Sequence, residues 1–251
     1  MPTPSIQIIP LAALPEIVPG DDLSRLIAEA ATRHDLRIAE GDIFVVAQKI
    51  VSKAEGKIIR LDSLQPSKRA DEWAAEYQKD PRVIELVLSE ASRIVRMERG
   101  VIVAETRHGF VCANAGVDVS NAPEGTAILL PDDADRSARA LQSQLEKHFG
   151  VHVAVIIADS FGRPWREGLV NVALGVAGIA PLVDYRGKPD ASGKTMQATV
   201  IARADEVAAA AELVMGKTDR VPVAIVRGVG SGQESGSGRD LIRPAAIDIF
   251  R

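Results

Sequence analysis

Residues 155–166 place side chains with the chemistry of a metal–phosphate site next to one another. Asp159 and Ser160 follow a short apolar run that is typical of a buried strand, and Arg163 and Arg166 come shortly after them. A carboxylate, a hydroxyl and two guanidinium groups together suit a hard metal ion that bridges phosphate oxygens. The carboxyl ends of strands are also where α/β proteins bind ligands. An ordinary Asp-Ser turn with solvated arginines fits the same residues equally well.

A second acidic residue, Asp118, lies in the small and apolar segment 115–121. A buried carboxylate needs a partner. A metal ion is one candidate, and the cap of a turn is the other and, for an isolated Asp, the more common one. Residues 48–53 bring polar groups directly after another apolar run, although Lys53 alone fits an ordinary surface lysine. Three further carboxylates are assigned to capping the helix that begins near them: Asp132, Asp133 and Asp135.

Three other features have simpler interpretations. Residues 211–218 fit a loose phosphate-loop pattern, but a predicted helix precedes them and a predicted strand follows, which inverts the order that such a loop needs. The dipole at a helix C-terminus then explains Lys217, which could still reach a phosphate as a point charge. The segment 228–232 lacks the third glycine of a dinucleotide fingerprint. Cys112, without a paired histidine, is expected to be a small buried hydrophobe.

The composition excludes several classes of protein. Among 251 residues, 30 Lys and Arg stand against 34 Asp and Glu, so the formal charge is −4 and we expect no nucleic-acid partner. The single cysteine rules out an intramolecular disulfide and a Cys-based zinc site. Residues 1–4 do not resemble the start of a signal peptide, and the apolar stretch 169–183 is too short to span a membrane. We therefore expect a soluble, cytoplasmic protein.

The elements that must position these residues alternate along the chain between helical and strand periodicity. The pattern predicts helices near residues 23–30, 67–80, 83–91, 135–150 and 205–215, and buried strands at 43–47, 153–158 and 221–226.

A hairpin is also predicted, because two strand-like runs, 101–106 and 110–115, flank Arg107-His108-Gly109. A purely parallel sheet would contain no such hairpin, so the fold class is α+β, a mixed α/β arrangement with antiparallel hairpins. No linker divides the chain, so residues 1–251 are expected to form one domain, and any second subdomain would be intertwined with the first. The Gly- and Ser-rich segment 228–238 predicts a mobile loop.

Five segments in register resemble the coenzyme F420-0:L-glutamate ligase family, over nearly the whole chain from residue 8 to about residue 230. They are Leu14-Pro15-Glu16-Ile17 with Pro19-Gly20-Asp21-Asp22, residues 48–56, residues 115–121, residues 159–166, and Ala204-Asp205-Glu206 with Met215-Gly216-Lys217. Some members are fused to a flavin-binding reductase module. The chain is too short to include one, so the resemblance is to the short form.

The resemblance implies a GTP-dependent amide-forming ligase with a ligase-specific fold of two interlocked subdomains. The lactyl carboxylate of coenzyme F420-0 would take the γ-phosphoryl group of GTP, and the amino group of L-glutamate would then displace phosphate from the acyl phosphate. Further glutamates, where they are added, are joined through γ-linkages. The resemblance also implies Mg²⁺ or Mn²⁺, two ions per site, and a monovalent cation such as K⁺ that assists the reaction. It further implies a homodimer whose subunits interlock.

The resemblance also carries residue roles to matching positions. Asp118 and Asp159 match the catalytic divalent-metal ligands, with Ser160 beside the second ion. The segment that lines the guanine nucleotide matches Leu14, Pro15, Glu16 and Ile17, and further nucleotide contacts match Gln48, Lys53 and Asn121. Gln48 stands where other members carry Ser, and Ser160 stands at a position where Thr also occurs. Both changes keep the capacity for hydrogen bonds.

Several roles stay open at this point. Arg163, Arg166, Glu206 and Lys217 lie in family-like segments without an assigned role, and segment 228–238 is a candidate lid over the acyl phosphate. Two rival functions also remain. One is a ligase of the same fold with another carboxylate acceptor, and the other is a nucleotide-binding module without catalysis.

Overall fold

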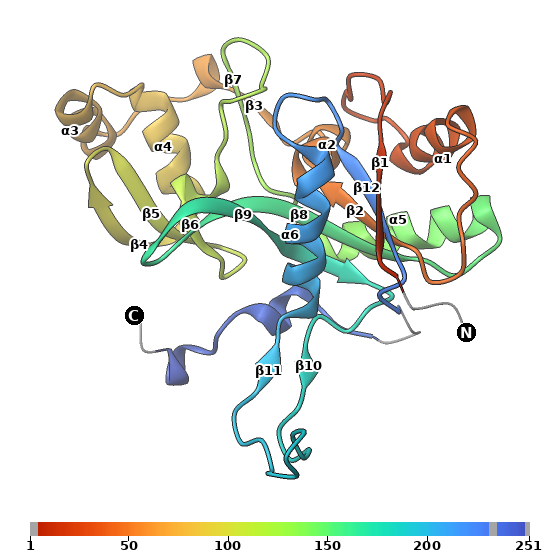
Figure 1. The fold of residues 1–251 in the computed structure, drawn as a ribbon. Helices are drawn as coiled ribbons and strands as arrows, with labels where there is room; N and C mark the ends of the chain where they lie inside the picture. The colour runs from red at the N-terminus through yellow and green to blue at the C-terminus, as the bar shows by residue number, and fades with distance from the viewer. Residues whose placement is uncertain (1–4, 231–234, 249–251) are drawn as a thin grey trace.

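A mixed five-stranded sheet forms the centre of the computed structural model, which describes residues 5–230 and 235–248 (Figure 1). The strand order is β1-β12-β2-β8-β9. The strands are β1 (Gln7–Leu11), β12 (Val223–Arg227), β2 (Ile43–Ala47), β8 (Ala154–Arg163) and β9 (Arg166–Ala177). The β2–β8 pair is parallel and the other neighbours are antiparallel.

Helices cover both faces of this sheet, which explains why β2 is apolar at every position. On one face, Phe44 and Val46 pack with α1 (Leu23–Arg33), α2 (Gln48–Ala54) and α5 (Ala134–Phe149). On the other face, Ile43 and Val45 pack against α6 (Arg203–Met215). These two clusters are the main core, and the side chains of each strand alternate between them.

A second group of elements is inserted between α2 and α5 and has its own apolar cluster. It lies on the left of Figure 1, beyond the far end of the β8–β9 hairpin. Its strands are β3 (Ile58–Arg60), β4 (Ala91–Glu98), β5 (Val101–Thr106), β6 (Val111–Ala113) and β7 (Thr126–Ile128), and its helices are η1 (Leu61–Ser63), α3 (Lys68–Tyr77), α4 (Pro81–Glu90) and η2 (Asn114–Gly116). The α+β class is therefore confirmed, while the interlocking of subdomains stays a prediction.

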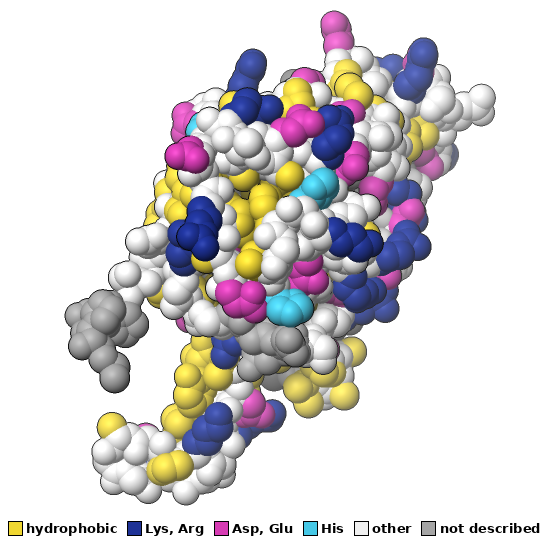
Figure 2. Space-filling model, turned by 90° about the vertical axis from the view of Figure 1, so that its right-hand side faces the viewer, with side chains coloured by type: hydrophobic (Ala, Val, Ile, Leu, Met, Phe, Trp, Pro, Cys, Tyr) yellow, Lys and Arg dark blue, Asp and Glu magenta, His cyan; other side chains and the backbone are white. Residues whose placement is uncertain are grey.

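The remaining elements lie outside these two groups. A two-stranded arm projects below the sheet in Figure 1, and two short 3-10 helices follow β12 in the sequence. They are β10 (Val183–Asp184), β11 (Val200–Ile201), η3 (Gly238–Leu241) and η4 (Ala245–Ile247). Among the described residues, no helix is long and apolar enough to cross a membrane. On the face in Figure 2, basic and acidic side chains are interspersed, and no broad basic field forms.

Local sequence rules located most element ends correctly. Asp22 accepts a hydrogen bond from the Arg25 N–H at the start of α1, and Asp133 does the same for Arg136 at the start of α5. Gly150 ends α5 in the left-handed conformation. The predicted hairpin between β5 and β6 is confirmed.

Two of the three assigned helix caps were wrong. Asp132 instead pairs with Lys57 and with Arg107. Asp135 is buried and accepts hydrogen bonds from the backbone of Val176, which lies on β9. These partners come from distant segments, so the local capping pattern could not indicate them.

The predicted end of the strand after Ala158 was also wrong, because β8 runs on to Arg163 and pairs with β9 in a long hairpin. Asp159 therefore lies within a strand. Residues 231–234 of the predicted mobile loop lie outside the described residues. At the end of that segment, Gly238 is buried and its N–H donates to the Asp135 carboxylate at 2.8 Å.

Candidate functional site

The loop that carries Asp118 is fixed by its backbone. Asp118 exchanges two backbone hydrogen bonds with Ile128, of 3.0 and 2.8 Å, which tie the loop to β7. Before it, Asn114, Ala115 and Gly116 all have positive φ angles, of 52°, 50° and 75°. A Cβ on Gly116 would lie 2.6 Å from the Leu130 side chain, so glycine is required there. This turn directs the Asp118 side chain towards α2.

Asp118 is paired with a lysine of α2. The Lys49 Nζ lies 2.5 Å from the Asp118 Oδ2, and it also donates to the Ser120 hydroxyl at 3.1 Å. The Ser120 N–H donates to the other Asp118 oxygen at 2.6 Å. Burial alone raises the pKa of Asp118, but the hydrogen bonds from Lys49 and Ser120 outweigh it, so the pKa is lowered. Asp118 is therefore ionised and satisfied at neutral pH.

Asp159 lies in the same neighbourhood, but no side chain of the described residues donates a hydrogen bond to it. Removal of water by the surrounding protein raises its pKa to about 6, and the negative charge of Asp118 adds to the rise. Among the described residues, the Ser160 N–H and the positive charges of Lys49 and Lys217 favour its ionised form. The two predicted carboxylates, far apart in the sequence, thus act on each other through space, and Lys49 acts on both.

Ser160 faces the opposite side of β8 from Asp159. Side chains alternate along a strand, and Ser160 is met by Lys217, which donates to its hydroxyl, and by Asn171 of β9, whose Oδ1 accepts from it at 2.6 Å. Lys217 follows the C-terminus of α6. The charges of Lys49 and Lys217 therefore reach Asp159 from different elements, one from each side of the strand.

The predicted nucleotide segment lies beside α2. Lys53 is one helical turn from Lys49, its side chain is only 10% exposed, and its Nζ lies 2.5 Å from a Glu16 oxygen. Glu16 and Pro15 are exposed, Leu14 is partly buried and Ile17 is buried. Lys53 and the segment 14–17 therefore lie side by side, and their contact with a nucleotide stays a prediction.

Two other predicted contacts are placed differently. Gln48 is 1% exposed and accepts a hydrogen bond from the Ser52 hydroxyl at 2.9 Å, so its amide oxygen is engaged inside the protein. Asn121 is exposed with a φ of 56°, two residues after the exposed Val119 on the Asp118 loop.

The residues without assigned roles lie mostly away from this centre. Arg166 is exposed at the turn of the β8–β9 hairpin, where Arg163 donates to the Glu167 carbonyl at 2.9 Å. Glu206 is exposed in the first turn of α6. Of this set only Lys217 reaches the site.

Lys49 was not selected from the sequence as a site residue, although its positive charge lowers the pKa of both Asp118 and Asp159. Its spacing of four from Lys53 on a predicted helix was a usable signal, because residues four apart share a helix face. Cys112 was also placed correctly as buried, but its proximity to Asp159 was not foreseen. Burial, with a smaller contribution from the Asp159 charge, raises the pKa of the Cys112 thiol to about 12, so it stays protonated.

The arrangement fits a divalent cation held jointly with a ligand. Among the described residues, no cluster of three or more His, Cys, Asp or Glu could hold a metal ion alone. Mg²⁺, however, is commonly bound by one or two carboxylates, with phosphate oxygens and water completing the shell. Asp159 is a carboxylate in a poorly hydrated place and forms no ion pair within the described part of the chain, and a cation there would favour its ionised form.

Comparison with known proteins gives consistent matches. The model of the family described as F420-0:Gamma-glutamyl ligase matches residues 12–228. The chain is 46% identical over 249 residues to a protein of Methanothermobacter thermautotrophicus named coenzyme F420:L-glutamate ligase, covering 98% of this chain and 99% of the relative. Proteins with the same name from Methanopyrus kandleri and Methanocaldococcus jannaschii are 47% and 46% identical, over 99% and 92% of this chain and 98% and 90% of those relatives.

Proposed function

Because the chain belongs to the F420-0:gamma-glutamyl ligase family, we propose that it joins L-glutamate to coenzyme F420-0 in a GTP-dependent reaction. The bond formed is an amide between the lactyl carboxylate of the cofactor and the amino group of glutamate. The reaction class is that of an acid–amino-acid ligase that passes through an acyl phosphate.

The observation that carries this proposal is the charged centre around Asp118 and Asp159. Lys49 and Lys217 both act on Asp159, and Lys53 lies one turn from Lys49 beside residues 14–17. Phosphoryl transfer needs positioning and neutralisation of charge more than covalent help from the protein. Lys49 and Lys53 on α2, together with the two carboxylates, supply both, since lysines offset phosphate charge and carboxylates retain cations.

The reaction proceeds in two displacements. In the first, a carboxylate oxygen of F420-0 attacks the γ-phosphorus of GTP and GDP leaves. In the second, the neutral amino group of glutamate attacks the acyl carbon, phosphate leaves, and the nitrogen loses a proton. Lys49 stabilises charge that builds on the transferred phosphoryl group, and Lys53 positions the nucleotide.

Asp118 and Asp159 would hold a divalent ion, Mg²⁺ or Mn²⁺. When bound, it supplies neutralisation of charge on the phosphate oxygens. Ser160, on the other side of β8, would serve a second ion beside Lys217. We also propose that a monovalent cation such as K⁺ assists the reaction, and that the protein acts as a homodimer in the cytoplasm.

Product analysis tests this function directly. Purified protein with GTP, Mn²⁺, L-glutamate and F420-0 should give, by mass spectrometry, F420 extended by one or more glutamates, with one GDP released per amide. Omitting either F420-0 or glutamate should abolish product.

Two outcomes would contradict the proposal. Turnover of GTP with another carboxylate and not with F420-0 would indicate a different acceptor. Tight GTP binding without any glutamate-dependent product would indicate a nucleotide-binding module.

A further inference from the structure

Two short connections join the main sheet to the inserted group of elements, residues 58–128. The first connection, residues 55–57, follows α2, and the second, residues 129–133, leads into α5. The two are tied to each other, because the Leu129 N–H donates to the Lys57 carbonyl at 3.0 Å. The first is also tied to α5, since the Ser137 hydroxyl donates to the Glu55 carboxylate. The orientation of the inserted group therefore depends on this pair of segments.

The candidate cation site is divided between these two parts of the molecule. Asp118 belongs to the inserted group, whereas Asp159 lies on β8 and Lys49 lies on α2. The Lys49 Nζ lies 2.5 Å from the Asp118 Oδ2, and the Asp118 charge acts on Asp159. Both interactions therefore depend on the angle at which the inserted group meets the main sheet.

The second connection is coupled to the Asp118 loop at two points. Ile128, directly before it, exchanges two backbone hydrogen bonds with Asp118, of 3.0 and 2.8 Å. Leu130 is only 4% exposed, and its side chain packs so closely on the turn before Asp118 that a Cβ on Gly116 would lie 2.6 Å from it. A shift of residues 128–130 would therefore move Asp118 as well.

Asp132 fastens the second connection to two other segments. Lys57 of the first connection donates to its Oδ2, and Arg107, which follows β5, donates to its Oδ1 at 2.7 Å. Arg107 is itself held at the end of α4, because its N–H donates to the Glu90 carbonyl at 3.3 Å. The hydrogen bond from Lys57 is the main cause that lowers the pKa of Asp132, so the carboxylate is ionised at neutral pH.

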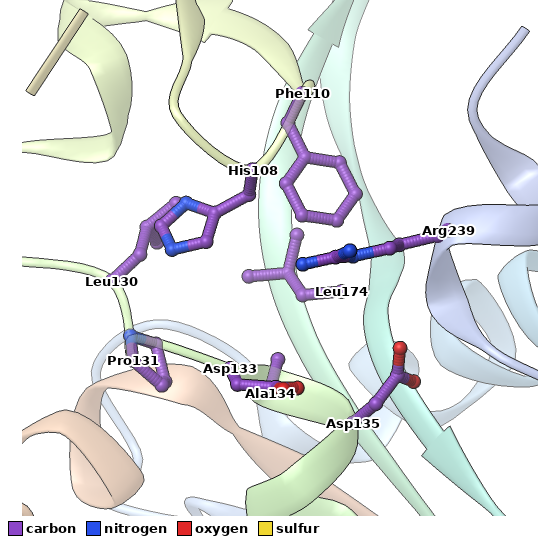
Figure 3. A pocket seen from close by; sticks show the side chains of 9 residues that line it. All are labelled: His108, Phe110, Leu130, Pro131, Asp133, Ala134, Asp135, Leu174 and Arg239. Carbon is purple, nitrogen blue, oxygen red and sulfur yellow. The ribbon is translucent and has the colours of Figure 1, made fainter. Parts of the chain in front are cut away.

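The seam beside Asp132 is closed by packed side chains. It encloses a small space with room for little more than a water molecule (Figure 3). The inserted group contributes His108 and Phe110 to its lining, the second connection contributes Leu130 and Pro131, and β9 contributes Leu174. Apolar packing is non-directional, so it holds the two parts together without fixing their angle. The ion pairs of Asp132, next in the chain to Pro131, are directional contacts that can fix it.

We propose that Asp132 is a positioning residue that sets Asp118 against Lys49 and Asp159, an inference that rests on the cation site of the proposed function. Its ion pairs with Lys57 and Arg107 hold the second connection in place, and residues 128–130 transmit that position to the Asp118 loop. Asp132 acts through the chain and does not bind the cation.

Hydrogen exchange of the ligand-free protein, followed by mass spectrometry, tests the coupling without a metal. In Asp132→Asn, peptides that cover Asp118 and Ile128 should exchange about three- to tenfold faster, as expected for the loss of partly exposed ion pairs. Peptides of β2 should exchange as in the wild type. Lys57→Gln, which breaks the same contact from the other side, should act in the same direction. Asp62→Asn, an exposed carboxylate of the inserted group paired with Arg60, is the matched control.

Mn²⁺ affinity in the presence of GTP tests the consequence for the site. Asp132→Asn should weaken Mn²⁺ binding by about three- to tenfold in the wild-type background. In the Asp118→Asn background it should cause no further loss, because a residue that acts through Asp118 has no effect once that carboxylate is gone. A carboxylate with a purely structural role would lower stability without this dependence on Asp118.

Three outcomes would overturn the positioning role. They are wild-type exchange at Asp118 and Ile128 in Asp132→Asn, faster exchange that extends equally to β2, and a loss of Mn²⁺ affinity that persists in the Asp118→Asn background. Absence of amide product from the wild type, with the exchange and affinity results as expected, would instead overturn the proposed function and leave the positioning role standing.

Discussion

The loop that carries Asp118 and the strand that carries Asp159 hold the same chemical group in contrasting ways. On the loop, the carboxylate is met by Lys49 at 2.5 Å and by the Ser120 N–H at 2.6 Å, and its pKa is lowered. On the strand, the carboxylate has no side-chain hydrogen bond among the described residues, and loss of water raises its pKa to about 6. One carboxylate is satisfied by the protein itself, and the other is not.

The difference makes Asp159 the carboxylate whose ionised form is the less stable of the two. Raising a carboxyl pKa from 3.8 to about 6 destabilises the ionised folded protein by up to about 3 kcal/mol, less the effect of partial exposure. A bound cation would remove that cost. An unsatisfied acid beside a satisfied one is therefore expected at a site that is complete only with its ligands.

Removing either carboxylate gives the largest expected effect and should not distinguish the two regions. Asp118→Asn and Asp159→Asn should each lower glutamate-dependent GDP release by about 10²- to 10³-fold, since each removes charge from one centre. Initial rates under saturating GTP measure this. Asp62→Asn, which alters an exposed carboxylate paired with Arg60, is the control and should keep full activity. Full activity in either site variant would separate that residue from the chemistry.

Stability should distinguish the two regions. At pH 7.5, Asp159→Asn should raise the free energy of unfolding by up to about 3 kcal/mol, because a neutral amide avoids the desolvated charge. Asp118→Asn should lower it by about 1 to 3 kcal/mol, because Lys49 loses its partner. Urea denaturation of the ligand-free protein measures both changes. If the two changes have the same sign, the contrast between loop and strand is wrong.

The pH dependence should also have opposite signs in the two regions. The folded-state pKa of Asp159 lies above its unfolded value, so its favourable contribution is present below pH 4 and is lost as the pH rises to about 6. The pKa of Asp118 is lowered, so its contribution is present above pH 4 and is lost as the pH falls.

Urea titrations at several pH values check these slopes. The stability difference between Asp159→Asn and the wild type should grow from pH 4 to pH 6 and then level off. A difference that is constant with pH would show that Asp159 does not titrate in that window.

The smallest expected effect concerns the lysine that the two regions share. Lys49→Gln should lower the free energy of unfolding by about 1 kcal/mol, since its ion pair with Asp118 is partly exposed. It should weaken GTP binding by about tenfold through the lost charge–phosphate contact. Isothermal titration calorimetry measures the affinity, with the exposed Lys68→Gln as control. Unchanged GTP affinity in Lys49→Gln would place the phosphates elsewhere.

Much of the fold follows from local patterns in the sequence. The starts of α1 and α5, the end of α5 and the β5–β6 hairpin depend on neighbouring residues, and the predicted ranges place all of them within about a residue. The length of β8 was not, because Ser160, Gly162 and Arg163 have no strand periodicity. They are held in the strand by pairing with residues 166–171, which is a long-range property.

In the candidate site, too, some features follow from neighbouring residues and others depend on long-range contacts. Asp118 and Asp159 could be selected from the sequence because each is an acid in an apolar or small context. The pairing of Lys49 with Asp118, and the burial of Asp135 under η3, depend on segments far apart in the chain.

Binding of Mn²⁺ in the presence of GTP, followed by electron paramagnetic resonance, tests the central claim most directly. If Asp118 and Asp159 retain a cation together, each single Asn variant should lose at least about tenfold in Mn²⁺ affinity, while Asp62→Asn binds as the wild type does. Wild-type Mn²⁺ affinity in either site variant would contradict a shared cation site between the loop and the strand.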